Sequence, residues 1–186
     1  MGESPLGEDH PLSAEIDLAR FERVIVPHLD AAYNLARWLT GNDHDAEDVV
    51  QEASLRAMQF FGGFHGDAGR PWLLAIVRNT CFTWLKKHRG REPAAAFDED
   101  IHSPLTDRDD PQRLQIGAEH HELLHKALEE MPLEFREVIV LRELEGLSYK
   151  EIADIAAIPV GTVMSRLARG RDRLQQRLTE RLKKDS

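Results

Sequence analysis

The chain has 186 residues, of which 41% are hydrophobic, 6% aromatic and 31% charged, and its formal net charge is −9. This length supports one medium domain or two small ones, and the few aromatic residues favour a helical protein with a small core over a β-sandwich. No apolar run approaches the roughly 20 residues that a membrane-spanning helix needs. The acidic N-terminus lacks the apolar stretch of a signal peptide, and these features predict a cytoplasmic protein. Cys81 is the only cysteine, which excludes an intrachain disulfide.

The charge is distributed in blocks along the chain. Residues 1–64 hold 4 basic and 12 acidic residues, and residues 94–130 hold 3 and 10. The two other segments are net basic. Residues 65–93 hold 6 basic and 2 acidic residues, and residues 131–186 hold 11 basic and 9 acidic residues. Two separate basic islands in an acidic chain suit two separate nucleic-acid contacts better than one extended basic surface.

The N-terminal half is predicted to be an arm followed by three helices. Residues 1–14 contain Gly, Pro, Ser and Glu and are interpreted as a flexible arm. Apolar residues then recur at helical spacing, although Pro27 can bend or break the first helix. A Gly-rich loop at 62–69 precedes the third helix. The three helices are expected over residues 16–39, about 45–61 and about 71–88.

The third helix has two dissimilar faces. The face expected in the core carries Leu73, Leu74, Val77, Cys81, Trp84 and Leu85. The outward face carries Trp72, Ile76, Asn79 and Thr83 at spacings of four, three and four, extended by Lys86 and Lys87. This outward face suits single-stranded DNA, because apolar groups contact bases and lysines bind phosphates, and the Gly-rich loop offers a pocket for an extruded base. On geometry alone, packing of Trp72 and Ile76 against the first helix explains the pattern equally well.

The C-terminal half follows a segment without helical periodicity. Residues 91–111 contain prolines and many acidic residues and are interpreted as a flexible acidic linker. No strand pattern occurs anywhere in the sequence. The predicted fold is therefore all-α, with two small helical domains, residues 15–90 and 112–186. Helices in the second domain are expected over about 112–130, 134–144, 148–157 and 159–182.

The last two helices are predicted to form a helix-turn-helix. Ser148 and Glu151 have the spacing of a capping box, and Pro159 suits the first turn of the helix that follows a short turn. The buried stripe of the last helix is expected at Val163, Leu167, Leu174 and Leu178. The opposite stripe is predicted to bind duplex DNA through Thr162, Ser165, Arg166, Arg169 and Arg173. Arginine reads guanine edges in the major groove and also binds phosphates. The alternative is a solvated basic face of a bundle helix.

Both halves resemble one known family. Asp45–Ala57 and Pro71–Asn79 resemble the promoter-melting domain of the extracytoplasmic-function (ECF) sigma factors of the sigma-70 family. Four further stretches resemble the second DNA-binding domain of these sigma factors: Leu128–Pro132, Arg136–Arg142, Leu147–Ala153 and Pro159–Arg171. The resemblance covers about 16–89 and 112–182. It implies a sigma factor that binds core RNA polymerase, recognises minus-thirty-five and minus-ten promoter elements and helps to melt DNA. It also implies control by an anti-sigma factor.

The resemblance assigns roles to individual residues. Asn79 aligns with an asparagine that reads a base of the melted minus-ten strand. The residues that align with the polymerase-binding helix are Asp45, Asp48, Gln51, Glu52 and Leu55. Thr83-Trp84 stands where many members carry an aspartate. Ala157 stands where many carry glycine, which is tolerable unless φ there is positive.

Other functions fit the sequence less well. A response regulator or another helix-turn-helix repressor requires a phosphate-accepting or ligand-binding N-terminal domain, and the N-terminal half lacks alternating strands and helices. His121 and His125, with His120 beside them, have the spacing of metal ligands on a helix, but no further ligand completes a site. Cys81 lies on the core stripe and is interpreted as a packing residue rather than a redox sensor. Neither a nucleophile–base arrangement nor a phosphate loop is present, so no enzyme and no cofactor is predicted.

Overall fold

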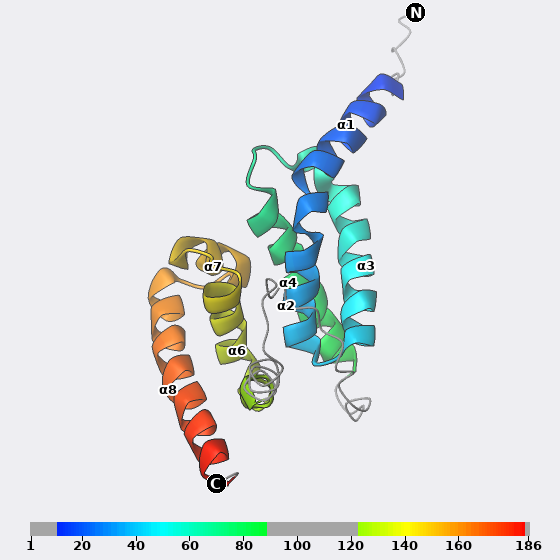
Figure 1. Ribbon diagram of the computed structural model, residues 1–186. Helices are drawn as coiled ribbons and strands as arrows, with labels where there is room; N and C mark the ends of the chain where they lie inside the picture. Colours follow the sequence, from blue (N-terminus) through cyan, green and yellow to red (C-terminus); the bar gives the residue numbers. More distant parts are fainter. Residues whose placement is uncertain (1–10, 89–122, 185–186) are drawn as a thin grey trace, which may run out of the picture.

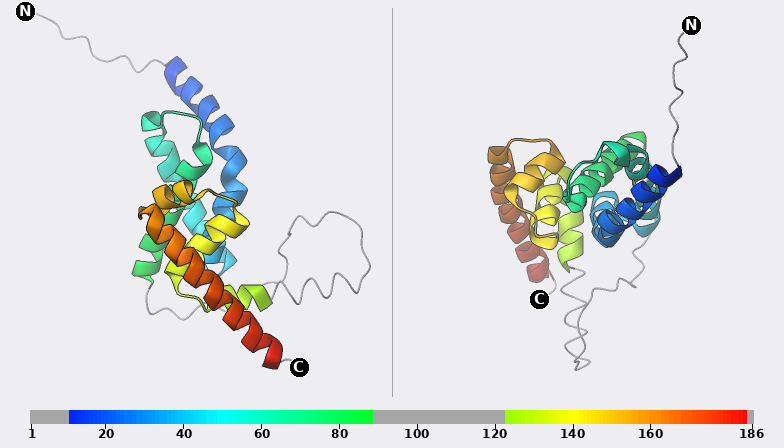
Figure 2. Two further views of the ribbon diagram at one scale, coloured as in Figure 1. Left: turned by 90° about the vertical axis from the view of Figure 1, so that its left-hand side faces the viewer. Right: turned by 90° about the horizontal axis from the view of Figure 1, so that it is seen from above.

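The structure, a computed structural model, describes residues 11–88 and 123–184. Within these two ranges every element is a helix and there is no strand. The helices form two groups that lie side by side, α1 to α4 in one and α6 to α8 in the other (Figures 1 and 2). The predicted all-α fold with two small domains is therefore confirmed. The predicted linker lies outside the described residues.

The first predicted helix is two helices in the structure. The chain breaks at a 3-10 turn that contains Pro27, which has no N–H to donate to a continuous helix. The first helix also begins earlier than predicted, at Pro11, inside the segment interpreted as an arm. The N-terminal group consists of α1 (Pro11–Val24), η1 (Val26–His28), α2 (Leu29–Thr40), α3 (Asp43–Phe60), η2 (Phe61–Gly63) and α4 (Gly69–Lys87).

Two tight junctions orient the helices of this domain. Gly41 ends α2 in the left-handed conformation, with φ 89°, and Asn42 caps α3 by accepting a hydrogen bond from the Asp45 N–H at 2.8 Å. At the start of α4, a Cβ on Gly69 would lie 2.3 Å from the Val24 carbonyl oxygen. Only glycine therefore lets the start of α4 approach the end of α1 this closely.

The N-terminal core lies between α2, α3 and α4. Its largest fully buried side chains are Ile25, Leu35, Leu39, Val49, Leu73 and Leu74. Cys81 is buried among them, and this burial raises the pKa of its thiol to about 12, so the group stays protonated. Trp84 and Leu85, which were expected in the core, are only half-buried. The interpretation of Cys81 as a packing residue therefore agrees with its position.

The C-terminal domain contains the predicted helix-turn-helix. Residues 123–129 are helical, and α6 (Leu133–Ile139) continues directly into the π-helical η3 (Val140–Leu144). The capping box of α7 is confirmed, because Ser148 Oγ accepts from the Glu151 N–H and Glu151 Oε2 accepts from the Ser148 N–H. Val163 and Leu167 are buried, whereas Leu174 and Leu178 are half-buried. The remaining elements are α7 (Tyr149–Ala156) and α8 (Val160–Lys184).

The turn between α7 and α8 meets the condition under which alanine is not tolerable there, a positive φ. Ala157 has φ 54° and ψ 47°, the left-handed conformation, and its N–H donates to the Ala153 carbonyl. The Cβ of an L-residue crowds the backbone in this region at a cost of roughly 1–2 kcal/mol. The helix-turn-helix therefore holds a strained alanine at a position that favours glycine.

Candidate nucleic-acid interface

The outward face of α4 is partly open and partly packed. Asn79, Thr83, Lys86 and Lys87 are exposed, whereas Trp72 and Ile76 are half-buried. The Trp72 ring lies 4.8 Å from that of Phe64, between centroids, and also contacts Phe61. The packing explanation thus holds in part, although the partners of Trp72 belong to the loop region after α3 and not to the first helix.

The Gly-rich loop is fastened to α1 by Arg20. Its guanidinium donates to the carbonyl oxygens of Phe64, at 2.9 Å, and Gly66, at 3.4 Å, and lies over the Phe61 ring. These contacts place Phe64 against Trp72 at the start of α4. The pocket for an extruded base stays a prediction, and Arg20 is a residue that the sequence pattern did not select.

Asn79 presents its amide to solvent near the middle of α4. Its Oδ1 accepts a hydrogen bond from Arg78 at 3.3 Å, and its backbone carbonyl accepts from Thr83 Oγ1 at 2.9 Å. An amide offers two donors and an acceptor, so Asn79 retains groups with which to pair a base edge. Lys86 and Lys87 occupy the last turn of α4, where the helix dipole favours positive charge.

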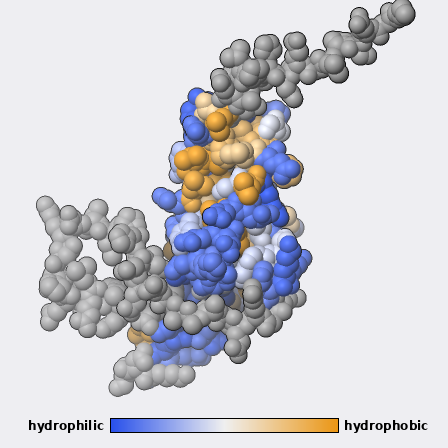
Figure 3. Space-filling model, turned by 90° about the vertical axis from the view of Figure 1, so that its right-hand side faces the viewer, coloured by the Kyte–Doolittle hydropathy of each residue, from blue (hydrophilic) through white to orange (hydrophobic). Residues whose placement is uncertain are grey.

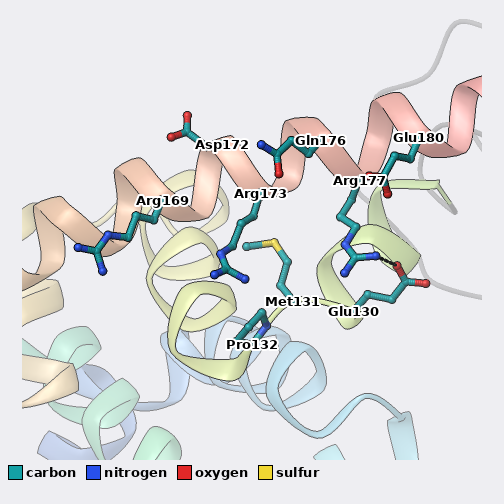
Figure 4. Close-up of a pocket in the computed structure, with 9 residues that line it drawn as sticks. All are labelled: Glu130, Met131, Pro132, Arg169, Asp172, Arg173, Gln176, Arg177 and Glu180. Atoms are coloured by element: carbon teal, nitrogen blue, oxygen red, sulfur yellow. Dashed lines mark ion pairs between the residues drawn. The ribbon is translucent and has the colours of Figure 1, made fainter.

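The basic residues of α8 lie on its flank and not opposite its buried stripe. Thr162 and Arg166 are half-buried, while Ser165, Arg169 and Arg173 are exposed. The Arg173 guanidinium lies 4.8 Å from the centre of the Phe135 ring of α6. In Figure 4, Arg173 points from α8 toward Met131 and Pro132. The predicted opposite position was wrong, because the arginines follow the edge where α8 meets α6.

The flank of α8 opposite the arginines carries exposed side chains that charge did not point to. Val160 and Met164 are exposed there, Met164 by 54%, and Ala168 follows four residues later and is also exposed. In the sequence these three residues are four apart, like Val163 and Leu167, but they start at a different position and so lie on a different side of the helix. Apolar side chains in the major groove contact the thymine methyl group, so this face is chemically suited to base contact.

An apolar surface occurs on the exposed side of α3. Leu55 is 66% exposed, and Met58 and Phe60 are also exposed. Figure 3 shows apolar side chains gathered in the upper half of this face of the molecule. A groove here is lined by Phe21, Leu29, Val50, Gln51, Ser54, Leu55 and Met58. Exposed apolar patches of this kind mark interaction sites.

The residues predicted to bind polymerase lie on or near this apolar surface. Asp48, Gln51, Glu52 and Leu55 are exposed on α3. Asp45 is half-buried, and its carboxylate accepts from Asn42 Nδ2 at 2.5 Å, which engages it in the start of the helix. Only Gln51 and Leu55 of the five predicted residues line the groove.

The alternative that histidines bind a metal is not needed to explain His125, because this side chain is packed in the core. This side chain is buried, with its ring 4.6 Å from that of Trp38 and its Nδ1 3.5 Å from Glu129 Oε1. His120 and His121 lie outside the described residues. In the part of the chain that the structure does describe, no three potential ligands gather into a metal site. Nor does this part contain a helix long and apolar enough to cross a bilayer.

Comparison with known proteins identifies the family. The family model for sigma-70 region 2 matches residues 24–91, and that for sigma-70, region 4 matches residues 121–174. The ECF RNA polymerase sigma-E factor of Escherichia coli is 36% identical over 141 residues, which cover 72% of this chain and 74% of the relative. The chain belongs to the ECF family of RNA polymerase sigma factors.

Further similarities of this sigma factor extend over most of its length. The ECF RNA polymerase sigma factor SigE of Mycolicibacterium smegmatis is 34% identical over 164 residues. This match covers 86% of the chain but spans only 62% of that relative. The sigma factor RpoE of Bartonella quintana, solved in complex with the anti-sigma factor NepR, is 27% identical with a TM-score of 0.68. That similarity covers 86% of this chain and 97% of the solved one.

The two family matches divide the described surfaces between two regions. Region 2 contains α3 and α4, and hence the apolar groove and the Asn79 stripe. Region 4 contains the helix-turn-helix and the first half of α8. A phosphate-accepting domain, which a response regulator requires, is not found in the N-terminal domain, because residues 24–91 match region 2 of a sigma factor.

Proposed function

We propose that this sigma factor binds core RNA polymerase, directs it to promoters with minus-thirty-five and minus-ten elements and helps to melt the DNA. It performs no chemistry of its own, and its partnership with polymerase places it in the cytoplasm. The observation that carries this proposal is the presence, in one chain, of two exposed helix surfaces suited to different states of DNA. One is the outward face of α4, and the other is the start of α8.

The face of α4 suits a melted strand. A duplex hides the faces and the Watson–Crick edges of its bases, so an exposed amide at Asn79 gains little from duplex DNA there. An open strand exposes both. The half-exposed Trp72 offers a ring for stacking, which contributes roughly 1–3 kcal/mol per base. Lys86 and Lys87 lie where they can bind the phosphates of the same strand.

The start of α8 suits duplex DNA. Met164, Ser165 and Arg169 are all exposed on the first half of α8, where the serine and the arginine offer hydrogen bonds and the methionine an apolar contact to the major groove. Thr162, Arg166 and Arg173 extend this surface along the flank, where they contact the backbone or neighbouring bases. In this proposal region 4 reads the minus-thirty-five element as duplex.

The apolar groove on α3 is the proposed docking site for polymerase. Leu55 and Gln51 line it, and Asp48 and Glu52 provide a charged rim on the same helix. An apolar centre with a polar rim is the usual anatomy of a protein interface. We further propose that an anti-sigma factor controls the protein, because the similar RpoE was solved in complex with one.

Run-off transcription with purified core polymerase tests the proposal. Promoter sequences are first selected from a random duplex library with the reconstituted holoenzyme. The protein should bind these duplexes weakly by itself, since each basic island is small, and should support specific initiation with core polymerase. Tight specific binding without polymerase, together with no transcription when polymerase is added, would instead identify a repressor.

The variant Asn79→Ala tests the assignment of the minus-ten reader. It should impair open-complex formation and relax preference at one base, since an amide pairing contributes about 1–3 kcal/mol of discrimination. A template melted in advance should recover opening but not base preference. Asn34→Ala, which removes an exposed amide from α2, is the matched control. If Asn79→Ala leaves both opening and base preference intact, the assignment of Asn79 is wrong.

A further inference from the structure

The two flanks of α8 differ in chemistry. Val160, Met164 and Ala168 are exposed on one flank, at intervals of four residues. Arg169 and Arg173 are exposed toward the other flank. Because each residue turns a helix by about 100°, Met164 and Arg169 lie about 140° apart around the axis of α8. An apolar edge and a basic edge therefore border the same outward side of this helix.

The positive charge on the apolar flank is neutralised within the protein. Arg171 lies on this flank, and its guanidinium donates two hydrogen bonds to Glu143 Oε1, at 3.0 and 2.6 Å. By contrast, neither Arg169 nor Arg173 forms an ion pair within residues 11–88 and 123–184. Guanidinium groups without a carboxylate attract phosphates. This charge distribution fits a DNA duplex whose phosphates lie along the arginine edge and whose bases meet the apolar edge.

Small residues separate the two edges. Gly161, Ser165 and Ala168 are exposed and lie between Met164 and Arg169 around the helix. A Cβ on Gly161 would meet no atom within 4 Å, so packing inside the protein does not require glycine there. Short side chains let the helix backbone come close to base edges in a groove. The longer side chains of Met164 and Arg169 can then reach the bases from either side.

Met164 can recognise a base only through its apolar surface. It is the fifth residue of α8, and residues near the start of the second helix of a helix-turn-helix contact base edges. A thioether is a weak acceptor and no donor, so a polar base edge held against it would lose water without gaining a partner. Thymine differs from the other bases because it presents a 5-methyl group in the major groove. Methionine is flexible and polarisable, which suits packing against such a group.

We propose that the duplex element read by α8 contains a thymine whose 5-methyl group packs against Met164. At this position the protein selects the base by its methyl group and not by a hydrogen bond. Val160 and Ala168 extend the apolar contact on either side of Met164. The inference rests on the proposed function, because it requires α8 to enter the major groove of a duplex, and it adds the identity of one base in the element.

Replacement of single thymines by deoxyuridine tests this directly, because it removes one methyl group and leaves base pairing unchanged. The element is first selected from a random duplex library with holoenzyme reconstituted from the full chain and core polymerase. Each thymine of the selected duplex is then replaced in turn, and the affinity of the holoenzyme is measured by competition. One thymine should show a loss of about three- to fivefold, the value expected for one buried methyl group.

Variants of α8 assign this loss to one side chain. Met164→Ala should bind the thymine and uracil duplexes equally, because the alanine side chain is too short to reach the methyl group. Met164→Arg should favour guanine at or beside this position, since guanine O6 and N7 accept hydrogen bonds from arginine. Arg169→Ala should weaken binding but keep the loss on uracil replacement, because Arg169 lies on the other flank.

Leu182→Ala is the matched control. Leu182 follows Met164 by five full turns of α8, so it lies on the same side of the helix, about 27 Å farther along the axis. It is 52% exposed, close to the 54% of Met164. Leu182→Ala should therefore keep the full loss on uracil replacement. Circular dichroism should show an intact helical fold for all four variants, since each replaces an exposed side chain.

Three outcomes would overturn the proposal. The first is a selected element in which no thymine loses affinity when uracil replaces it. The second is a loss that persists in Met164→Ala. The third is a Met164→Ala variant that binds core polymerase more weakly but keeps its promoter preference, which would identify the apolar flank as a protein-docking surface. Failure of the proposed function is distinguishable, because the holoenzyme would then select no specific duplex, whichever residue occupied position 164.

Discussion

Replacing Ala157 by glycine should stabilise the protein. Ala157 has φ 54° in the turn of the helix-turn-helix, and the left-handed conformation costs an L-residue roughly 1–2 kcal/mol. Glycine removes this strain but adds about 0.4–1 kcal/mol of conformational entropy to the unfolded chain. The Ala157 side chain is exposed, so no packing is lost. The net gain should be about 0.5–1 kcal/mol in the free energy of unfolding, provided the N–H of residue 157 still donates to the Ala153 carbonyl.

Urea denaturation followed by circular dichroism measures this difference. A gain of 1 kcal/mol corresponds to a rise in melting temperature of about 2–4 °C for a chain of this size. Ala168→Gly is the matched control, because Ala168 is exposed inside α8, where glycine should instead destabilise by about 0.5–1 kcal/mol. The reasoning is refuted if both variants destabilise the protein equally, since the conformation of residue 157 would then carry no strain.

Three more variants test other parts of the structure. Gly69→Ala should destabilise by about 2 kcal/mol or more in urea denaturation, because its Cβ would meet the Val24 carbonyl; a neutral effect would contradict this close approach. Leu55→Lys should weaken binding to core polymerase at least tenfold in fluorescence anisotropy, at unchanged stability, whereas Leu144→Lys, at an exposed leucine of η3, should not. Burial raises the pKa of Glu137 in the folded protein above its ordinary value of 4.5. The stabilisation that Glu137 provides is therefore fully present below pH 4.5, and it is lost as the pH rises through the raised pKa. The stability of the wild-type protein relative to Glu137→Gln should therefore fall over that range, and a difference independent of pH would refute this.

The sequence by itself determined the features that depend on local spacing. The apolar period of 3.6 residues located the core of α4 at Leu73, Leu74 and Val77, and the Ser148–Glu151 spacing located the start of α7. Caps and periodicity involve residues within one or two turns of each other, so the order of residue types along the chain is sufficient to find them. The resemblance of two separate stretches to one family likewise needs only residue order.

Only the tertiary structure decided which partners distant residues meet. The sequence pattern fitted Trp72 equally well as an exposed residue and as a packed one. In the structure, the loop that Arg20 binds places Phe64 against the Trp72 ring. The conformation of Ala157 depends on how α8 returns across α7, which a helical pattern does not contain. The Arg78–Glu137 pair joins residues 59 positions apart. Its formation depends on domain packing, and no local period encodes a contact that exists only when two domains meet.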